Sequence, residues 1–213
     1  MEINLIVFDF DGTLFDTKKD IAASVNAALI KYGFQPVDEE TCWRYTGDGT
    51  EILLRRVLQN KNVSNFKEML NYTIKYYSLN FANFTMPVDN VLAFIDKFRE
   101  KKKVILSNKN LEIINKILDK FNLSDKFQAV YGKESFSKSK PDPYPILEIM
   151  KKFGTTRENT VYIGDSINDI TLSKRAGIKS FIIPSGVTPI EEIKHLKPFK
   201  IFHDYKEIEN LIK

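Results

Sequence analysis

The apolar run of residues 3–8 (INLIVF) ends directly in the acidic turn of residues 9–13 (DFDGT). A short apolar run bounded by a turn signal is typical of a buried strand. In open α/β sheets, ligands bind beyond the carboxyl ends of the strands, which is where this turn lies. Side chains alternate along an extended chain, so Asp9 and Asp11 point to the same side and their charges repel unless a cation intervenes. The segment therefore predicts an α/β sheet whose first strand ends at a site for a cation and a phosphate.

Three later segments also place polar residues where a predicted strand ends or a predicted helix begins. They are Ser107 and Asn108 after the apolar residues 104–106, Lys140 in the proline-containing loop 140–143, and Asp165 and Asp169 after the apolar residues 161–163. Together with the first turn, they supply carboxylates, a hydroxyl and a lysine at strand ends, where a ligand of an α/β sheet is expected.

The order of these groups resembles the four motifs of the haloacid dehalogenase-like (HAD) superfamily of phosphohydrolases. The resemblance covers nearly the whole chain. Within the superfamily the chain is most similar to the phosphoglycolate phosphatase-like branch, which often has a Thr-Asn-Lys second motif, close to residues 107–109 (SNK) here, and a glycine-containing cap loop. The resemblance implies a Rossmann-like parallel-sheet core with an inserted α-helical cap.

The distribution of strand and helix signals agrees with this α/β organisation. Residues 17–86 contain no strand-like run, and their apolar residues recur at helical spacing. After Pro87, strand and helix signals alternate, which favours a parallel sheet covered by helices. We expect a catalytic core of residues 1–16 and 87–213 and a helical cap of residues 17–86. The expected core elements are helices at 88–100, 110–121, 144–153 and 167–176 and strands at 103–106, 128–131, 161–163, 181–183 and 200–202.

The first acidic pair suits a two-step phosphoryl transfer, because phosphate monoesters are inert in water and a covalent intermediate divides the reaction. On the family pattern, Asp9 is the nucleophile that forms an aspartyl phosphate. Asp11 is the general acid for the leaving alcohol and then the base for the attacking water. A halide leaves without a proton, so Asp11 favours phosphoryl chemistry over dehalogenation.

The remaining acids suit Mg²⁺, which prefers six oxygen ligands and often takes one or two carboxylates with phosphate and water. We expect Asp9, the backbone carbonyl of Asp11 and Asp165 to bind the ion. Asp169 either binds it, directly or through water, or holds Lys140.

The lysine and the hydroxyl motif suit the phosphate. Lys140 balances the charge of the nucleophile and the phosphate. Ser107 and Asn108 donate hydrogen bonds to the transferring phosphoryl oxygens.

The loop Thr46-Gly47-Asp48-Gly49 between two expected cap helices is the candidate specificity element. A polar loop with glycines can close over a substrate, although a plain helix-to-helix turn fits the pattern equally well. Asp48 departs from the branch and suits an anionic substrate poorly. The expected cap also contains Arg44, Arg55 and Arg56. An arginine can bind a substrate carboxylate through two hydrogen bonds, but each of these can equally face solvent.

The leading interpretation is a magnesium-dependent phosphoric monoester hydrolase for a small phosphorylated metabolite, such as a phosphoglycolate-like phosphomonoester. A sugar phosphomutase of the same superfamily typically has Val where Thr13 stands, so Thr13 favours the hydrolase. An inorganic pyrophosphatase is a further alternative. A non-catalytic binding module is more remote, because it would be expected to have lost Asp9, Asp11 or a metal ligand.

The overall composition points away from several other classes. The net charge is only +4 and its basic residues are scattered, so we expect no nucleic-acid partner. No apolar run approaches the length of a membrane span, and the acidic Glu2 speaks against a signal peptide. The single cysteine, Cys42, excludes an internal disulfide. We expect a cytoplasmic enzyme without a membrane partner, acting as a monomer or homodimer.

Overall fold

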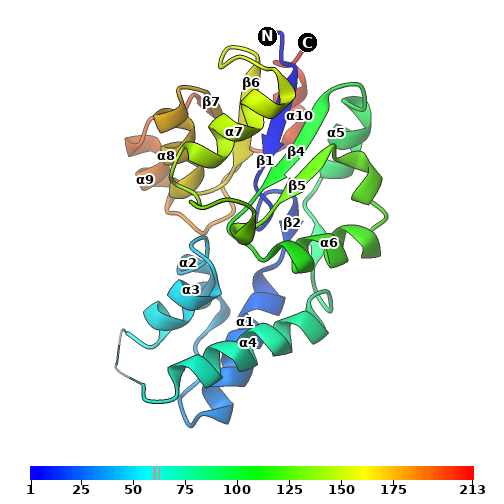
Figure 1. The fold of residues 1–213 in the computed structure, drawn as a ribbon. Helices are drawn as coiled ribbons and strands as arrows, with labels where there is room; N and C mark the ends of the chain where they lie inside the picture. Colours follow the sequence, from blue (N-terminus) through cyan, green and yellow to red (C-terminus); the bar gives the residue numbers. More distant parts are fainter. Residues whose placement is uncertain (60, 62) are drawn as a thin grey trace.

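The computed structural model describes residues 1–59, 61 and 63–213. In this part of the chain, six strands form a sheet in the order β5-β4-β1-β6-β7-β8, with all neighbours parallel (Figure 1). The strands are β1 (Leu5–Phe8), β4 (Lys102–Leu106), β5 (Ala129–Tyr131), β6 (Thr160–Gly164), β7 (Lys179–Ile182) and β8 (Lys200–Ile201). The expected α/β fold with a Rossmann-like parallel sheet is confirmed, and β1 with its acidic turn lies inside the sheet.

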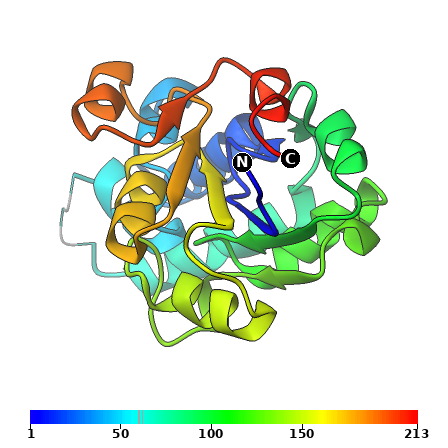
Figure 2. The ribbon, with the colours of Figure 1, turned by 90° about the horizontal axis from the view of Figure 1, so that it is seen from above.

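Helices cover both faces of this sheet (Figure 2). They are α5 (Val91–Lys97), α6 (Leu111–Lys120), α7 (Tyr144–Phe153), α8 (Ile167–Ala176), α9 (Ile190–His195) and α10 (Tyr205–Glu209). Leu5 and Val7 of β1 belong to one apolar cluster with residues of α7 and α8. Ile6 and Phe8 belong to a second cluster that includes residues of α5 and α10. This alternation buries β1 on both sides and explains why its sequence is apolar throughout.

The segment between β1 and α5 contains a separate group of helices. They are α1 (Lys18–Lys31), α2 (Glu39–Arg44), α3 (Thr50–Val57) and α4 (Phe66–Asn80). In Figure 1 they lie beyond the carboxyl ends of the sheet strands, on the side away from the two termini. The chain leaves the sheet and returns to it through an antiparallel ribbon of β2 (Phe15–Asp16) and β3 (Met86–Pro87). We call residues 17–86 the helical insertion.

Several core elements differ from the expected bounds. Helix α5 is shorter than the predicted 88–100: it begins after Asn90, whose φ is +64°, in the left-handed region. Beyond its carboxyl end, the buried Lys103 ammonium donates to the carbonyl oxygens of Phe98, Arg99 and Lys101.

No sequence pattern predicts α2, α9 and α10, because helices of five or six residues are too short to show a period. Within the described residues, no helix is long and apolar enough to cross a membrane.

Candidate active site

The acidic turn after β1 is held in place by the neighbouring strand. The backbone N–H of Asp9 donates to the carbonyl of Ile163 in β6 at 2.9 Å, and the N–H of Phe10 donates to Asp9 Oδ1 at 2.7 Å. Gly12 has φ +78°, and a Cβ there would collide with the carboxylate of Asp165. A glycine is therefore required, because the turn passes directly against the second acidic motif.

Three carboxylates meet at this edge of the sheet. Asp9, Asp165 and Asp169 each offer an oxygen within 4.8 Å of the others, and all three residues are buried. The ammonium of buried Lys140 lies 2.8 Å from Asp9 Oδ1 and 2.8 Å from Asp169 Oδ1. Burial lowers the pKa of Lys140, but the charges of Asp169 and Asp9 outweigh it and raise that pKa above its ordinary value. Three acids thus share one permanent cation.

Asp169 uses both of its oxygens within the protein. Oδ1 accepts from Lys140, and Oδ2 accepts from the backbone N–H groups of Asp165 and Ser166 and from the Ser166 hydroxyl, at 2.7–3.1 Å. The Asp169 carboxylate therefore caps the start of α8 and orients the lysine. The arrangement favours the expected role of Asp169 in holding Lys140. Because both of its oxygens already have partners, contact with a metal ion would be through water.

Asp165 faces Asp9 across the cluster. Its oxygens accept from the Thr13 hydroxyl at 3.4 Å and from the Ser185 hydroxyl. Burial, with the charges of Asp169 and Asp9 added, raises the pKa of Asp165 well above its usual range. Burial likewise raises the pKa of Asp9 to about 6, against the lowering effect of Lys140. Ser185, which follows β7, thus borders the acidic cluster.

The donor set of this cluster fits a hard divalent cation. The available atoms are carboxylate oxygens, the ligands that Mg²⁺ prefers. Burial and mutual repulsion raise the pKa values of Asp9 and Asp165, and a cation bound between the carboxylates would offset that repulsion.

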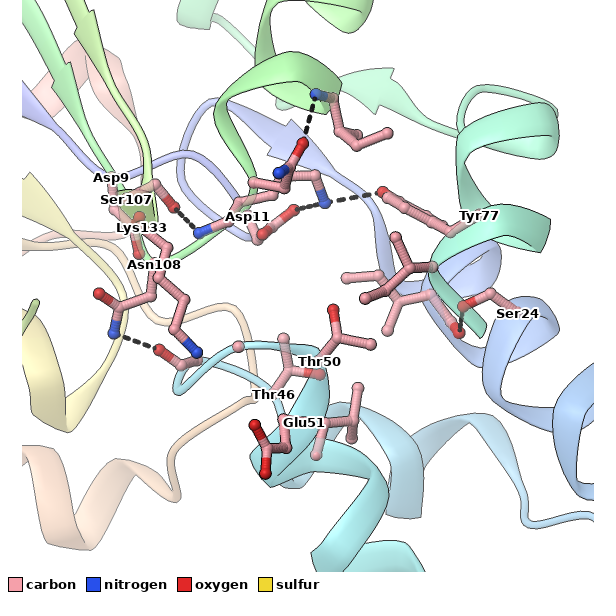
Figure 3. A pocket seen from close by; sticks show the side chains of 18 of the residues that line it. Asp9, Asp11, Ser24, Thr46, Thr50, Glu51, Tyr77, Ser107, Asn108 and Lys133 are labelled. Carbon is pink, nitrogen blue, oxygen red and sulfur yellow. Dashed lines mark hydrogen bonds and ion pairs between the residues drawn. The ribbon is translucent and has the colours of Figure 1, made fainter. Parts of the chain in front are cut away.

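Asp11 has partners of its own, away from Lys140. Its Oδ1 accepts from the Lys109 ammonium at 2.8 Å and from the Thr17 hydroxyl at 2.7 Å. Lys109 also donates to the hydroxyl of Tyr77 in α4 at 2.7 Å, so one buried ammonium joins Asp11 to the helical insertion (Figure 3). No role for Lys109 or Tyr77 follows from the sequence analysis, although Lys109 lies within the SNK match to the second motif.

The two residues of the second motif are used differently. The Ser107 hydroxyl accepts from the backbone N–H of Lys109 at 3.3 Å, and Ser107 lines the main cavity. The Asn108 amide donates one hydrogen to the Gly47 carbonyl at 2.9 Å and the other to the Lys140 carbonyl at 3.0 Å. Ser107 is thus available to a phosphate, whereas the expected donation from Asn108 would require it to give up one of these bonds.

A cavity of about 490 Å³ opens between the strand ends and the helical insertion (Figure 3). Asp9, Asp11 and Asp165 line it from the core, together with Ser107, Asn108 and Lys133. Thr46, Gly47, Gly49 and Thr50 line it from the insertion, and its apolar wall includes Ile21, Trp43, Leu53, Leu70 and Ile74. The acidic turn therefore faces a cavity with a mixed polar and apolar lining.

Asp48 is placed apart from its loop neighbours. It lines a second cavity, where its carboxylate lies 2.6 Å from Arg56 Nη2 and accepts from the Asn168 amide at 2.8 Å. Asp48 is not among the residues that line the main cavity, whereas its loop neighbours Thr46, Gly47 and Gly49 are, and a role of this loop in substrate specificity stays a prediction. Arg44, Arg55 and Arg56 also do not line that cavity in the described residues.

Two adjacent residues of α2 are buried, and the second of them bonds to the core. Cys42 is fully buried, and burial raises the pKa of its thiol to about 12, so it has a packing role. The adjacent Trp43 is also buried, and its indole N–H donates to the carbonyl of Ser185 at 3.3 Å.

Comparisons with known proteins agree with this geometry. A family model described as haloacid dehalogenase-like hydrolase matches residues 6–183. A phosphoglycolate phosphatase of Psychrobacter arcticus is 31% identical over 98% of this chain and 95% of that protein. A phosphoglycolate phosphatase of Aquifex aeolicus is 33% identical over 84% and 83% of the two chains. The crystal structure of a predicted phosphoglycolate phosphatase from Haemophilus somnus is similar with a TM-score of 0.91, at 25% identity over 99% of this chain and 98% of that chain.

Proposed function

The chain belongs to the haloacid dehalogenase-like hydrolase family, and from that premise we propose that it is a magnesium-dependent phosphoric monoester hydrolase. Its substrate is a small phosphorylated metabolite, a phosphoglycolate-like phosphomonoester, and the reaction passes through an aspartyl phosphate. One observation carries the proposal: the Asp9 carboxylate opens onto the cavity beside Ser107 and Asp165, with the Lys140 ammonium 2.8 Å from its Oδ1. The similarity to phosphoglycolate phosphatases supports the substrate class.

In the first step, a carboxylate oxygen of Asp9 forms a bond to phosphorus while the bond from phosphorus to the leaving alcohol breaks. Oδ1 already accepts from Phe10 N–H and Lys140, so Oδ2 is the oxygen assigned to attack. The Lys140 ammonium offsets the repulsion between nucleophile and phosphate. The Ser107 hydroxyl donates to a phosphoryl oxygen.

Asp11 moves the protons. Asp11 delivers a proton to the leaving oxygen and then takes one from the water that attacks the phosphorus of the aspartyl phosphate. Lys109 and Thr17 both hold Asp11 Oδ1, which leaves Oδ2 as the oxygen for proton transfer. The products are the alcohol, inorganic phosphate and regenerated Asp9.

Asp9, Asp165 and the backbone carbonyl of Asp11 would hold Mg²⁺, and Asp169 would reach it through water. When bound, the ion supplies positive charge to the phosphoryl oxygens and relieves the repulsion among the acids. The buried, crowded carboxylates described above support this assignment.

A second anionic group on the substrate would meet Lys133. This side chain lines the main cavity, and a Cβ at Gly49 would lie 2.8 Å from its Nζ, so the ammonium lies against the loop of the insertion. Two acids also line the cavity but have partners: Glu51 is paired with Arg55, and Glu134 accepts hydrogen bonds at the start of α6. Lys133 is thus the cation that we assign to a carboxylate such as that of phosphoglycolate.

The alternative functions are an inorganic pyrophosphatase, a sugar phosphomutase and a non-catalytic module. Pyrophosphate also offers a second anion to Lys133, so inorganic pyrophosphatase is the second candidate. Thr13 continues to favour hydrolysis over the sugar phosphomutase reaction, and the presence of every expected acid speaks against a non-catalytic module. The proposed enzyme is cytoplasmic and is a monomer or homodimer. It has no nucleic-acid or membrane partner.

The deciding experiment measures phosphate release by the purified protein from a panel of phosphorylated metabolites with Mg²⁺. Pyrophosphate, a hexose bisphosphate and para-nitrophenyl phosphate belong in the panel. We expect the highest kcat/KM with a small phosphomonoester that carries a carboxylate. A clear preference for pyrophosphate would replace the leading candidate with the second, and no release from any compound would refute the hydrolase.

A further inference from the structure

The loop of residues 46–49 is docked to the core through one carbonyl group. The Gly47 carbonyl accepts from the side-chain amide of Asn108 at 2.9 Å and from that of Asn168 at 3.2 Å. Asn168, at the start of α8, also donates to Asp48, which Arg56 holds from the opposite side. Two core amides thus converge on one atom of the helical insertion.

Asn108 also holds the backbone of the catalytic lysine. The N–H of Lys140 donates to Asn108 Oδ1 at 3.1 Å, and the Lys140 carbonyl accepts from Asn108 Nδ2 at 3.0 Å. Because a backbone N–H can only donate, this pair fixes which side of the amide carries its oxygen. The same planar group therefore binds both backbone polar groups of Lys140 and the Gly47 carbonyl.

The geometry points to a coupling between these two contacts. Asn108 is buried, so withdrawal of the Gly47 carbonyl leaves an N–H without its partner, and an unsatisfied buried donor is costly. Rotation of the amide toward another acceptor would loosen its two bonds to Lys140, whose ammonium lies 2.8 Å from Asp9 Oδ1. We propose that Asn108 is a positioning residue that links docking of loop 46–49 to the placement of Lys140. The catalytic consequence rests on the proposed function, but the coupling itself does not.

The first test measures backbone amide hydrogen exchange in the full-length protein, at Lys140 and within residues 46–50. NMR reports each amide separately, and mass spectrometry reports peptides that contain either segment. Asn168→Ala removes a donor to Gly47 and Asp48 and leaves Asn108 and Lys140 unaltered. We expect exchange to accelerate about 3- to 10-fold at Lys140 as well as within residues 46–50, the size expected for one lost hydrogen bond. Asn80→Ala is the matched control, because its amide donates only locally, to the Tyr76 carbonyl.

Faster exchange in loop 46–50 with unchanged exchange at Lys140 in Asn168→Ala would overturn the coupling. No acceleration at either place would overturn it too, because the loop would then not depend on this docking point. Both readings are independent of whether the protein is a phosphatase.

The second test separates positioning from direct phosphate binding. With para-nitrophenyl phosphate, Asn108→Ala should lower kcat about 100-fold, as expected when a catalytic group is displaced by about 1 Å, whereas Asn168→Ala should lower it less than 10-fold. Inorganic phosphate should bind Asn108→Ala within about 3-fold of the native affinity. A large loss of phosphate affinity with a normal kcat would mean that Asn108 contacts the phosphoryl group and does not position Lys140. If the native protein hydrolyses nothing, the proposed function fails and the exchange test still decides the coupling.

Discussion

The ammonium group of Lys109 lies 2.8 Å from Oδ1 of Asp11 and is buried beneath the hydroxyl of Tyr77. Burial lowers the pKa of Lys109, but the charge of Asp11 and the hydrogen bonds to Asp11 and Tyr77 outweigh it and raise that pKa above its ordinary value, so the lysine stays charged. A permanent cation thus orients the proposed general acid. It also joins that acid to a helix of the insertion.

Lys109→Met should therefore impair proton transfer to the leaving group. We expect kcat for an alkyl phosphate to fall about 100-fold, the lower range for loss of general acid catalysis. The effect on para-nitrophenyl phosphate should be much smaller, because para-nitrophenolate leaves without protonation. Steady-state kinetics with both esters check this, with Lys116→Met on the surface of α6 as the control. Equal losses on the two substrates would count against a role through Asp11.

Asp9→Asn should abolish turnover, because an amide cannot attack phosphorus as a carboxylate does. The fold should survive, since Lys140 keeps its ion pair with Asp169 and the substitution removes a charge from a crowded acidic cluster. Phosphate release and thermal melting followed by circular dichroism measure the two effects. Substantial activity in protein free of the native enzyme would sink the nucleophile assignment.

Activity should require Mg²⁺ and be suppressed by Ca²⁺. Calcium takes more oxygen ligands at longer distances, so it could bind both oxygens of Asp9 and remove the one needed for attack. Phosphate release is measured after chelation, after Mg²⁺ is restored and in mixtures with Ca²⁺. Full turnover in chelator would refute the metal requirement, and unaltered turnover in excess Ca²⁺ would refute the proposed inhibition.

Mg²⁺ affinity should increase with pH through the region around pH 6. The pKa of Asp9 is raised to about 6 and that of Asp165 is raised well above its usual range, so both carboxyls retain protons at low pH. The ion must displace those protons, which weakens binding below pH 6 and releases protons on binding. Calorimetric titrations in two buffers of different ionisation enthalpy report the protons directly. A pH-independent affinity between pH 5 and 7 would contradict this assignment.

Lys133→Met should lower kcat/KM for phosphoglycolate about 10- to 100-fold, which corresponds to loss of a charged hydrogen bond of about 1.5–3 kcal/mol. Ethyl phosphate, which lacks the carboxylate, should be affected less than 3-fold. Lys138→Met provides a control, because that lysine is exposed and pairs with Asp142. The assignment fails if both substrates lose activity equally.

The parts of the site that the sequence predicts are those set by strand ends. Asp9, Ser107 and Asp165 each follow a short apolar strand, and a parallel sheet brings such positions to one edge whatever the rest of the chain does. The same local logic predicts the alternation of strands and helices in the core. These features depend on patterns within a few residues.

The contacts that the sequence does not predict join segments that no pattern relates. Asn108 meets Gly47, 61 positions away, and Asn168 meets Asp48, 120 positions away. The pairing of Asp48 with Asn168 depends on how the insertion is placed against the core, and helical periodicity does not specify that placement. The contact between Lys109 and Tyr77 is unpredicted for the same reason, because Tyr77 belongs to the insertion.

The chain contains one tryptophan, and its position makes it an internal optical probe. Trp43 belongs to α2 of the insertion, but its indole N–H donates to the carbonyl of Ser185, whose hydroxyl donates to Asp165. Emission from this indole depends on its hydrogen bonding and exposure to water. Lifting the insertion from the core would break that bond and shift the spectrum to longer wavelength. Ultraviolet fluorescence of the unlabelled protein would therefore report any separation of α2 from Ser185 without an added label.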